Sequence, residues 1–282
     1  MNPPTQSALA WNYSAPWWLP GGHAQTIWAS LFSDAGLHAK RQYRRVRWET
    51  PDGDFIDLDW LAPPTAHVPA QERPLLVLFH GLEGNSDGHY AQAFARAAQA
   101  TGMDFVVPHF RGCSGEINRA PRAYYAGDYQ EIDWILRSLR QVHTGPLCAV
   151  GISLGGNALL RWAAEAGDTA RQTARAVCAV CAPLDLTACG LHISSGLSHI
   201  LYGRRFLHTM KRKALQKWQQ FPDLFDREAL LRARTLLDFD QVFTAPLHGF
   251  DSALDYWSRA SAKPHLGTLR VPSLVINAQN DP

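Results

Sequence analysis

From Leu75 onward, the apolar residues of this chain gather in short continuous runs, and the segments between the runs carry apolar residues at helical spacing. Such runs are typical of strands in a parallel sheet that is buried on both faces, and the intervening segments suit crossover helices. We therefore predict an α/β fold with a mostly parallel sheet and helices on both faces. The predicted strands are Leu75–Phe79, Asp104–Val107, Leu147–Ile152, Ala176–Cys181 and Ser273–Ala278, and the predicted helices are Tyr90–Ala100, Gln130–Val142 and Asn157–Ala166.

The region before Leu75 follows two other patterns. Polar and apolar residues alternate over Arg44–Glu49 and Phe55–Leu61, on either side of the turn-forming Pro51-Asp52-Gly53, which predicts an antiparallel hairpin. Residues 1–43 carry four tryptophans among prolines and glycines. We interpret them as an irregular arm packed onto the body, because aromatic-rich arms rarely stay detached. The four are Trp11, Trp17, Trp18 and Trp28.

An insertion separates the last two predicted strands. About 90 residues lie between Cys181 and Ser273, far more than a simple crossover needs. Helical spacing recurs over Leu197–Gln219, Asp226–Leu237 and Asp251–Ala260, which predicts a helical cap that roofs a substrate pocket. We interpret the chain as one domain, with the arm at 1–43, the core at 44–183, the cap at 184–265, and a core strand with an acid-bearing loop at 266–282.

One glycine-rich motif points to nucleophilic catalysis. Gly151-Ile152-Ser153-Leu154-Gly155-Gly156 lies directly after a predicted strand and before a helix. A serine on so tight a turn has strained backbone angles, and the residues two positions away on each side must be small, as Gly151 and Gly155 are. Ser153 is therefore the predicted nucleophile, at a helix N-terminus that favours negative charge. A glycine turn with an incidental serine is the alternative.

A second motif, Phe79-His80-Gly81-Leu82-Glu83-Gly84, ends the first predicted parallel strand. A loop in this position supplies half of an oxyanion hole, so we predict that the backbone N–H groups of Leu82 and Leu154 stabilise the oxyanion of a tetrahedral intermediate. Gly81 supports the same motif. We expect His80 to brace the loop, and the alternative is that His80 is the catalytic base.

The acid of a serine triad should follow a later strand, in the chain order nucleophile, acid, histidine. Asp281 does so and is the predicted acid. Asp185 is the alternative acid, with helix capping as its competing role. No histidine follows Asp281, and those between Ser153 and Asp281 all lie in the insertion. We therefore expect the catalytic histidine outside this chain, on a C-terminal strand and helix that the chain lacks; a degenerate hydrolase is the competing explanation.

Taken together, these motifs resemble the YheT-like α/β-hydrolases, AB hydrolase family four, which are related to the ABHD esterases and phospholipases. The resemblance covers nearly the whole chain. It implies the α/β-hydrolase fold, hydrolysis of carboxylic or lipid esters, a nucleophile on Ser153 and an acid on Asp281. Besides the two motifs above, it rests on Pro20 to Thr26 (PGGHAQT), Phe110 to Gly115 (FRGCSG), Ala245 to Asp255 (APLHGFDSALD) and Asn277 to Pro282 (NAQNDP).

The predicted reaction is ester cleavage through an acyl-enzyme on Ser153, with a small acyl ester or lipid as substrate. This chemistry needs no cofactor and no metal. Acyl transfer to an alcohol or thiol is the first rival, because another nucleophile can capture the same acyl-enzyme. A noncatalytic binding protein that keeps the hydrolase pocket is the second rival, and the absent histidine favours it.

Charge and composition limit the partners. A formal net charge of +2 gives no reason to expect nucleic acid as a partner. No apolar stretch approaches the roughly 20 residues of a membrane span, and the N-terminus lacks a secretory signal, so we expect a cytoplasmic protein.

The segment Leu197–Gln219 carries six cationic side chains and no acidic one. A solvated face is its main interpretation, and weak membrane-surface contact is the alternative. Five cysteines, an odd number, suit reduced and buried thiols.

Overall fold

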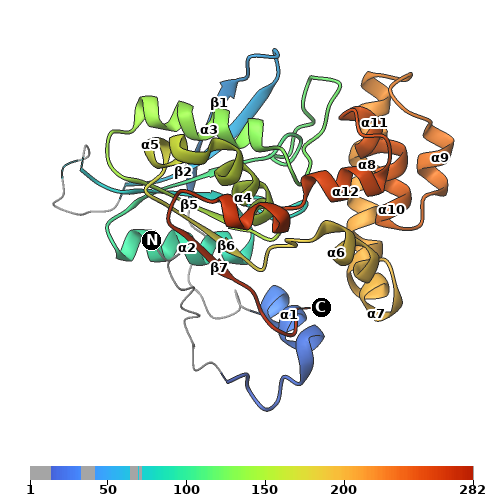
Figure 1. Ribbon diagram of the computed structural model, residues 1–282, viewed down its shortest axis with the longest axis horizontal. Coiled ribbons are helices and arrows are strands. Elements are labelled where there is room, and N and C mark those ends of the chain that lie inside the picture. Colours follow the sequence, from blue (N-terminus) through green and yellow to red (C-terminus); the bar gives the residue numbers. More distant parts are fainter. Residues whose placement is uncertain (1–13, 33–41, 64–68, 70–71, 282) are drawn as a thin grey trace. The chain divides into compact units, whose positions relative to one another are not determined.

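The computed structural model describes residues 14–32, 42–63, 69 and 72–281. The chain divides into two compact units, both traced in Figure 1. The larger unit runs from His38 to Ala278 and contains the sheet with its helices. The smaller unit combines Met1–Leu37 with Gln279–Pro282.

In the smaller unit, the described residues include the helix α1 (Gly21–Phe32), which begins directly after Pro20. The prediction of an irregular arm is wrong for these residues. A proline just before a helix is a start signal, and the adjacent glycines obscured it. The rings of Trp18 and Trp28 meet edge to face with their centroids 4.8 Å apart. Trp11 lies outside the described residues.

In the larger unit, the described residues form a seven-stranded sheet with the order β1-β2-β4-β3-β5-β6-β7 (Figure 1). β1 pairs antiparallel with β2, and β2 with β4, while all other neighbouring strands are parallel. The predicted hairpin and parallel sheet are confirmed. The bounds are β1 (Tyr43–Glu49), β2 (Phe55–Leu61), β3 (Leu75–Phe79), β4 (Asp104–Pro108), β5 (Leu147–Ile152), β6 (Ala176–Val180) and β7 (Ser273–Ile276).

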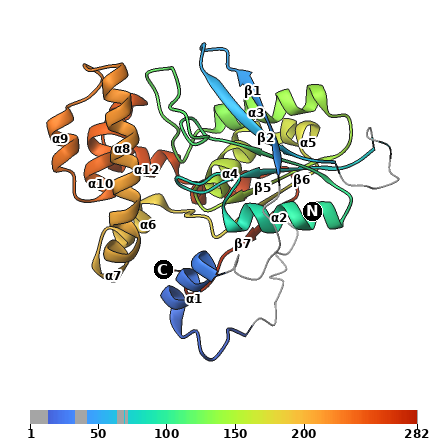
Figure 2. The same cartoon turned by 180° about the vertical axis from the view of Figure 1, so that it is seen from behind.

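Helices cover both faces of this sheet, with α2 on one side and α3 on the other (Figures 1 and 2). Alternate residues of β3 contribute to two separate core clusters because successive side chains of a strand point to opposite faces. Val77 packs in a cluster with Trp162 of α4, whereas Leu78 packs in a cluster with Ala91 of α2. The bounds are α2 (His89–Ala100), α3 (Tyr129–Val142), α4 (Leu154–Ala166) and a short α5 (Ala170–Thr173).

A group of helices lies between β6 and β7 in the chain and beyond one end of the sheet in space (Figures 1 and 2). These helices bury a small apolar cluster of their own, which includes Leu207, Ala214 and Phe243. We call this group the cap. Its helices are α6 (Leu186–Ile193), α7 (Gly196–Ser198), α8 (Arg204–Gln220), α9 (Arg227–Arg232), α10 (Leu236–Phe239), α11 (Ala245–Leu247) and α12 (Ala253–Ala260), with π-helical turns at His199–Gly203 and Asp240–Thr244.

Two details of the cap differ from the sequence expectation. The predicted helix at Asp226–Leu237 is interrupted after Arg232, because Thr235 starts α10 with a capping box that it shares with Asp238. The helix α6 begins directly after Asp185, as the capping role of that residue requires, but it lies outside the three predicted cap helices. It carries Cys189, which is exposed, whereas the other four cysteines are buried or half-buried and none of the five forms a disulfide.

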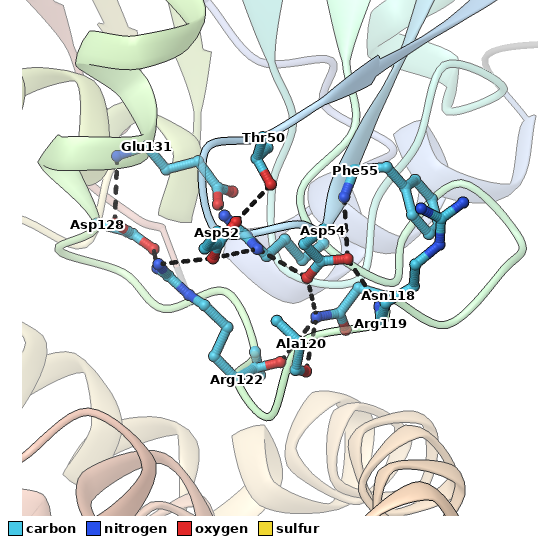
Figure 3. Close-up of polar contacts among 12 residues, drawn as sticks. Thr50, Asp52, Asp54, Phe55, Asn118, Arg119, Ala120, Arg122, Asp128 and Glu131 are labelled. Atoms are coloured by element: carbon cyan, nitrogen blue, oxygen red, sulfur yellow. Dashed lines mark hydrogen bonds and ion pairs between the residues drawn. The ribbon is translucent and has the colours of Figure 1, made fainter.

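A cluster of buried charges ties the turn of the β1–β2 hairpin to the loop after β4 (Figure 3). The fully buried carboxylate of Asp54 accepts hydrogen bonds of 2.7 Å from Arg111 Nη1, Asn118 Nδ2 and the backbone N–H of Arg119. Burial raises the pKa of Asp54, but these bonds outweigh burial and lower it below its ordinary value. Arg111 also pairs with Glu131 of α3. The loop is therefore anchored on one side by the hairpin and on the other by α3.

Candidate active site

Ser153 lies between the end of β5 and the first residue of α4, with φ 52° and ψ −121°. Its backbone N–H donates to Val180 O of β6 at 2.9 Å, and its carbonyl accepts from Gly156 N at 2.9 Å. A non-glycine residue in this left-handed region is strained, and such strain gathers at functional sites. Within the described part of the chain, no hydrogen bond of the Ser153 hydroxyl is found. The Ser153 side chain is half-buried, and its hydroxyl is available for a reaction.

Glycines surround Ser153 because the backbone segments there approach too closely for a Cβ atom. A Cβ on Gly151 would lie 2.4 Å from Gly155 O, and a Cβ on Gly155 would lie 2.5 Å from His80 O. A Cβ on Gly81 would lie 3.2 Å from Ser153 Cβ. The loop after β3 is therefore packed directly against the serine turn, as the two glycine motifs require.

Two backbone amides near Ser153 are unpaired in the described residues. Leu154 is the first residue of α4, where an N–H has no intrahelical acceptor. Leu82 follows Gly81, and neither the Leu82 nor the Leu154 N–H donates to an acceptor in the described part of the chain. Since the helix N-terminus adds a positive potential, this is an environment that favours an anion.

His80 is buried, and both nitrogens of its ring are hydrogen-bonded to the backbone. Nε2 accepts the N–H of Phe110 at 3.1 Å, so Nδ1 must carry the proton that it donates to Gly81 O at 2.8 Å. Burial lowers the pKa of His80 to about 3, which keeps the ring neutral. This arrangement fits the bracing role and leaves neither nitrogen available to take the Ser153 proton.

The loop after β3 also depends on residues that the sequence reasoning missed. Tyr90 Oη accepts the N–H of Gly81 at 3.2 Å, and Tyr124 Oη accepts the N–H of Glu83 at 3.0 Å. Both tyrosines come from other elements, Tyr90 from α2 and Tyr124 from the loop before α3. The sequence carries no signal for such contacts, because a tyrosine in a helix or loop usually packs in the core.

The two candidate acids differ in their surroundings. Asp281 is exposed and belongs to the smaller unit, five residues beyond the end of β7. Asp185 caps α6, where its side chain accepts Ala188 N–H at 3.0 Å and pairs with Lys263 Nζ at 3.1 Å. These two contacts lower the pKa of Asp185. Asp185 therefore has the helix-capping role that competed with the role of acid. Around Ser153 the structure brings together Leu82, Leu154, His80, Gly81, Gly151 and Gly155.

Known proteins resemble this chain over most of its length. Residues 74–282 match the family described as alpha/beta hydrolase fold. The putative esterase YheT of Escherichia coli is 39% identical over 267 residues, which cover 92% of this chain and 75% of YheT. Mouse phospholipase ABHD3 is 28% identical over 244 residues, 85% of this chain and 59% of that protein. These named relatives support a hydrolase of the esterase class.

Two further similarities extend this result. The medium-chain fatty acid ethyl ester synthase/esterase 2 of Saccharomyces cerevisiae is 29% identical over 233 residues, 74% of this chain and 51% of that protein. An esterase of Pyrobaculum calidifontis has 18% identity and a TM-score of 0.51 over 91% of this chain and 72% of that one, which shows the fold. Among the residues described, no helix has the length and apolarity that crossing a membrane requires. The chain belongs to the α/β-hydrolase fold family and is similar to its YheT-type esterases.

Proposed function

We propose that this chain provides the nucleophile and the oxyanion hole of a serine esterase. The observation that carries the proposal is the backbone of Ser153, held at φ 52° between a strand and a helix, with the unpaired N–H groups of Leu82 and Leu154 on the adjoining segments. Two fixed donors of this kind each contribute roughly 3 to 4 kcal/mol to stabilising an oxyanion. Gly81, Gly151 and Gly155 support this arrangement because each allows two backbone segments to approach closely.

The proposed reaction proceeds through an acyl-enzyme. Ser153 Oγ attacks the ester carbonyl and loses its proton to a base, and the carbonyl oxygen becomes an oxyanion that accepts hydrogen bonds from Leu82 and Leu154. The intermediate then expels the alcohol, which takes up the proton. Water attacks the acyl group in the same way and releases the carboxylic acid and Ser153. No metal or organic cofactor enters these steps.

The roles of acid and base follow the chain order of this fold. We assign Asp281 as the carboxylate that orients the base and stabilises its protonated form. The base in this order is a histidine that follows the acid. His80 and His248 are unsuited to this role, because both ring nitrogens of His80 are hydrogen-bonded to the backbone and both ring nitrogens of His248 lie 2.8 Å from backbone carbonyls.

We infer that the acyl group comes from a lipid. The relatives named a phospholipase and a medium-chain fatty acid ethyl ester synthase/esterase both take their names from lipid acyl groups. The helical cap at 184–265 would enclose the acyl chain over Ser153. Apart from α8, the helices of the cap are short, and two of its segments are π-helical turns.

Acyl transfer is a second candidate activity, and one observation favours it. The name of the yeast relative describes both the synthesis and the hydrolysis of ethyl esters. A transferase would pass the acyl group from Ser153 to an alcohol in place of water. Product analysis by mass spectrometry, with and without ethanol, separates these two activities, because a transferase forms the new ester in preference to the free acid.

The central test uses the natural full-length protein. Hydrolysis of p-nitrophenyl butyrate and labelling by a fluorophosphonate should both occur, and both should be lost in Ser153→Ala. If the wild-type protein neither turns over esters nor becomes labelled, while still binding acyl esters in calorimetry, the noncatalytic binding protein becomes the correct interpretation. The observation that favours this rival is that no hydrogen bond joins the Ser153 hydroxyl to a base among the described residues.

We also propose that the protein is cytoplasmic and contacts a membrane surface through its cap. Leu197 and Ile200 are 66% and 54% exposed, next to the exposed Arg204 and Arg205. Apolar side chains beside cations suit an anionic bilayer. Vesicles of phosphatidylcholine with phosphatidylglycerol should sediment the protein, and Arg204→Glu/Arg205→Glu should reduce this binding. Equal binding by the variant and the wild-type protein would refute the contact.

A further inference from the structure

Two lysines of α8 in the cap, Lys213 and Lys217, reach the sheet-bearing body of the larger unit. They are four positions apart and therefore share one face of the helix. Lys217 is almost fully buried, and its Nζ donates to Asn118 O at 2.5 Å and to Ala120 O at 2.9 Å. Lys213 Nζ lies 2.9 Å from Glu83 Oε1. The cationic face of α8 is thus partly internal, which differs from the solvated face that the sequence suggested.

The partner of Lys213 is the residue that follows Leu82 in the loop after β3. Glu83 has φ 57°, in the left-handed region that a residue with a side chain rarely adopts. Its N–H donates to Tyr124 Oη at 3.0 Å, and Tyr124 Oη donates to Glu83 Oε1 at 2.7 Å. One carboxylate oxygen therefore accepts from both Tyr124 and Lys213. A strained conformation persists only where its surroundings determine it, and these three contacts do so.

The protonation states fit these contacts. Burial lowers the pKa of Lys213, but its contacts with Cys113, at 3.2 Å, and with Glu83 outweigh burial and raise the pKa above its ordinary value. The ammonium is therefore charged at neutral pH. Burial also raises the pKa of Tyr124 well above its ordinary value, so its hydroxyl keeps the proton that it donates to Glu83.

We propose that Lys213 and Tyr124 are positioning residues that act through Glu83 to aim the Leu82 N–H at the oxyanion. This proposal rests on the proposed function of the Ser153 site. The N–H groups on both sides of Leu82 are fixed, that of Gly81 by Tyr90 and that of Glu83 by Tyr124. Because Lys213 belongs to α8, the position of the Leu82 N–H depends in part on a contact that the cap supplies.

The test measures kcat and KM of the natural full-length protein for p-nitrophenyl butyrate. Lys213→Met removes the charge and keeps the apolar stem, and we expect kcat to fall about tenfold with KM changed less than about twofold, because misplacing a catalytic group by about 1 Å costs up to 100-fold. Lys213→Arg should restore most of kcat. The inhibition constant of a trifluoromethyl ketone, which forms a tetrahedral oxyanion on the serine, should rise in parallel.

Lys211→Met is the matched control. Lys211 lies on the same helix, and among the described residues its Nζ donates to Leu231 O and Ala233 O, both in the cap, so its loss should leave kcat unchanged. Glu83→Gln should resemble Lys213→Met, and the double variant should lose no more than either single one, since both remove the same contact. If Lys213→Met and Lys211→Met have equal kcat, the positioning role is overturned while the esterase proposal stands. If wild-type turnover does not require Ser153, both proposals are overturned.

Discussion

The two halves of the proposed oxyanion hole are held in place by different physical means. The half that contains Leu154 lies on the serine turn, where Gly151 and Gly155 leave no room for a Cβ atom. Close packing of backbone against backbone fixes this half, and it needs no polar side chain. Its geometry follows from the glycines of one short motif and from the backbone carbonyls of Phe79 and His80 that pack against Gly155.

The half that contains Leu82 lies in a loop that polar side chains hold. Tyr90 binds the N–H of Gly81, and Tyr124 binds the N–H of Glu83. Each support comes from an element distant in sequence, and the cap helix α8 adds an ion pair. The half that contains Leu154 is therefore fixed by close steric packing. The half that contains Leu82 is fixed by an ion pair and hydrogen bonds, which can rearrange. We expect added side-chain volume to disturb the half that contains Leu154. The half that contains Leu82 should respond to the loss of a charge, of a single polar atom or of the contact from the cap.

Removal of the nucleophile should have the largest effect and leave both halves of the hole in place. Ser153→Ala in the natural full-length protein should lower ester turnover by about 10⁴- to 10⁶-fold, because the remaining donors bind the oxyanion without a covalent intermediate. Stopped-flow or plate assays with p-nitrophenyl butyrate measure this loss, and unchanged thermal unfolding verifies that the variant folds. A variant that keeps wild-type turnover would mean that Ser153 is not the nucleophile.

A single added methyl group should disrupt the sterically fixed half. A Cβ on Gly155 would lie 2.5 Å from the carbonyl oxygens of both Phe79 and His80, so β3 or α4 must shift. We expect Gly155→Ala to lower the free energy of unfolding by about 3 kcal/mol, the upper range for overpacking. Urea titrations followed by fluorescence measure the change.

Gly267→Ala is the control for this effect, since a Cβ there would have no atom of another described residue within 4 Å, apart from its two chain neighbours and the backbone of its own helix. It should change the free energy of unfolding by no more than about 0.5 kcal/mol. Equal stability of the Gly155→Ala and Gly267→Ala variants would show that the serine turn has room to relax, and the contrast between the two halves would then fail.

This contrast also explains how much the sequence could predict. The strands, the hairpin and the glycine motifs depend on local spacing and backbone sterics, and the observed strands β2, β3 and β5 have the predicted bounds. The glycines that surround Ser153 could be predicted because the same backbone sterics require them. The family match then supports the fold that these motifs imply.

Contacts between distant side chains could not be predicted in this way. Glu83, Tyr124 and Lys213 meet across 41 and 130 residues, and each of them alone is an ordinary surface or core residue in the sequence. The cationic stretch of α8 suggested solvent or lipid as its surroundings, because a sequence does not show which side of a helix faces a partner. The break after Arg232 was missed because the apolar spacing continues through it.

Regions held by polar contacts should respond to pH, and Asp240 of the cap allows a direct test. Its buried carboxyl accepts Trp257 Nε1 at 2.7 Å and Thr244 Oγ1 at 2.5 Å, and burial raises its pKa from 3.8 to about 6. Between pH 4 and 6 the folded state therefore holds a proton that the unfolded state has lost. Stability falls as pH rises through this window, by about 2 kcal/mol, and the loss is complete above pH 6.

Asp240→Asn should remove this dependence. The difference in free energy of unfolding between the variant and the wild-type protein should move by about 2 kcal/mol in favour of the variant from pH 4 to pH 7. Urea unfolding at half-unit steps of pH measures it, and the subtraction cancels the titration of all other groups. Parallel curves for the two proteins would show that Asp240 titrates alike in the folded and unfolded states.

The smallest effect should come from one oxygen atom on the polar side of the hole. Tyr90→Phe leaves the Gly81 N–H without its acceptor, so the residue before Leu82 loses a constraint, and we expect kcat to fall about tenfold with little change in KM. Tyr256→Phe is the matched control, because Tyr256 Oη likewise accepts a backbone N–H, that of Ala126 at 3.0 Å. Both variants should lose similar stability, about 1 to 2 kcal/mol, since each leaves one buried donor unpaired. Only Tyr90→Phe should lower kcat. If both lower kcat equally, the Tyr90 hydroxyl contributes to stability alone, and the loop is held by packing just as the serine turn is.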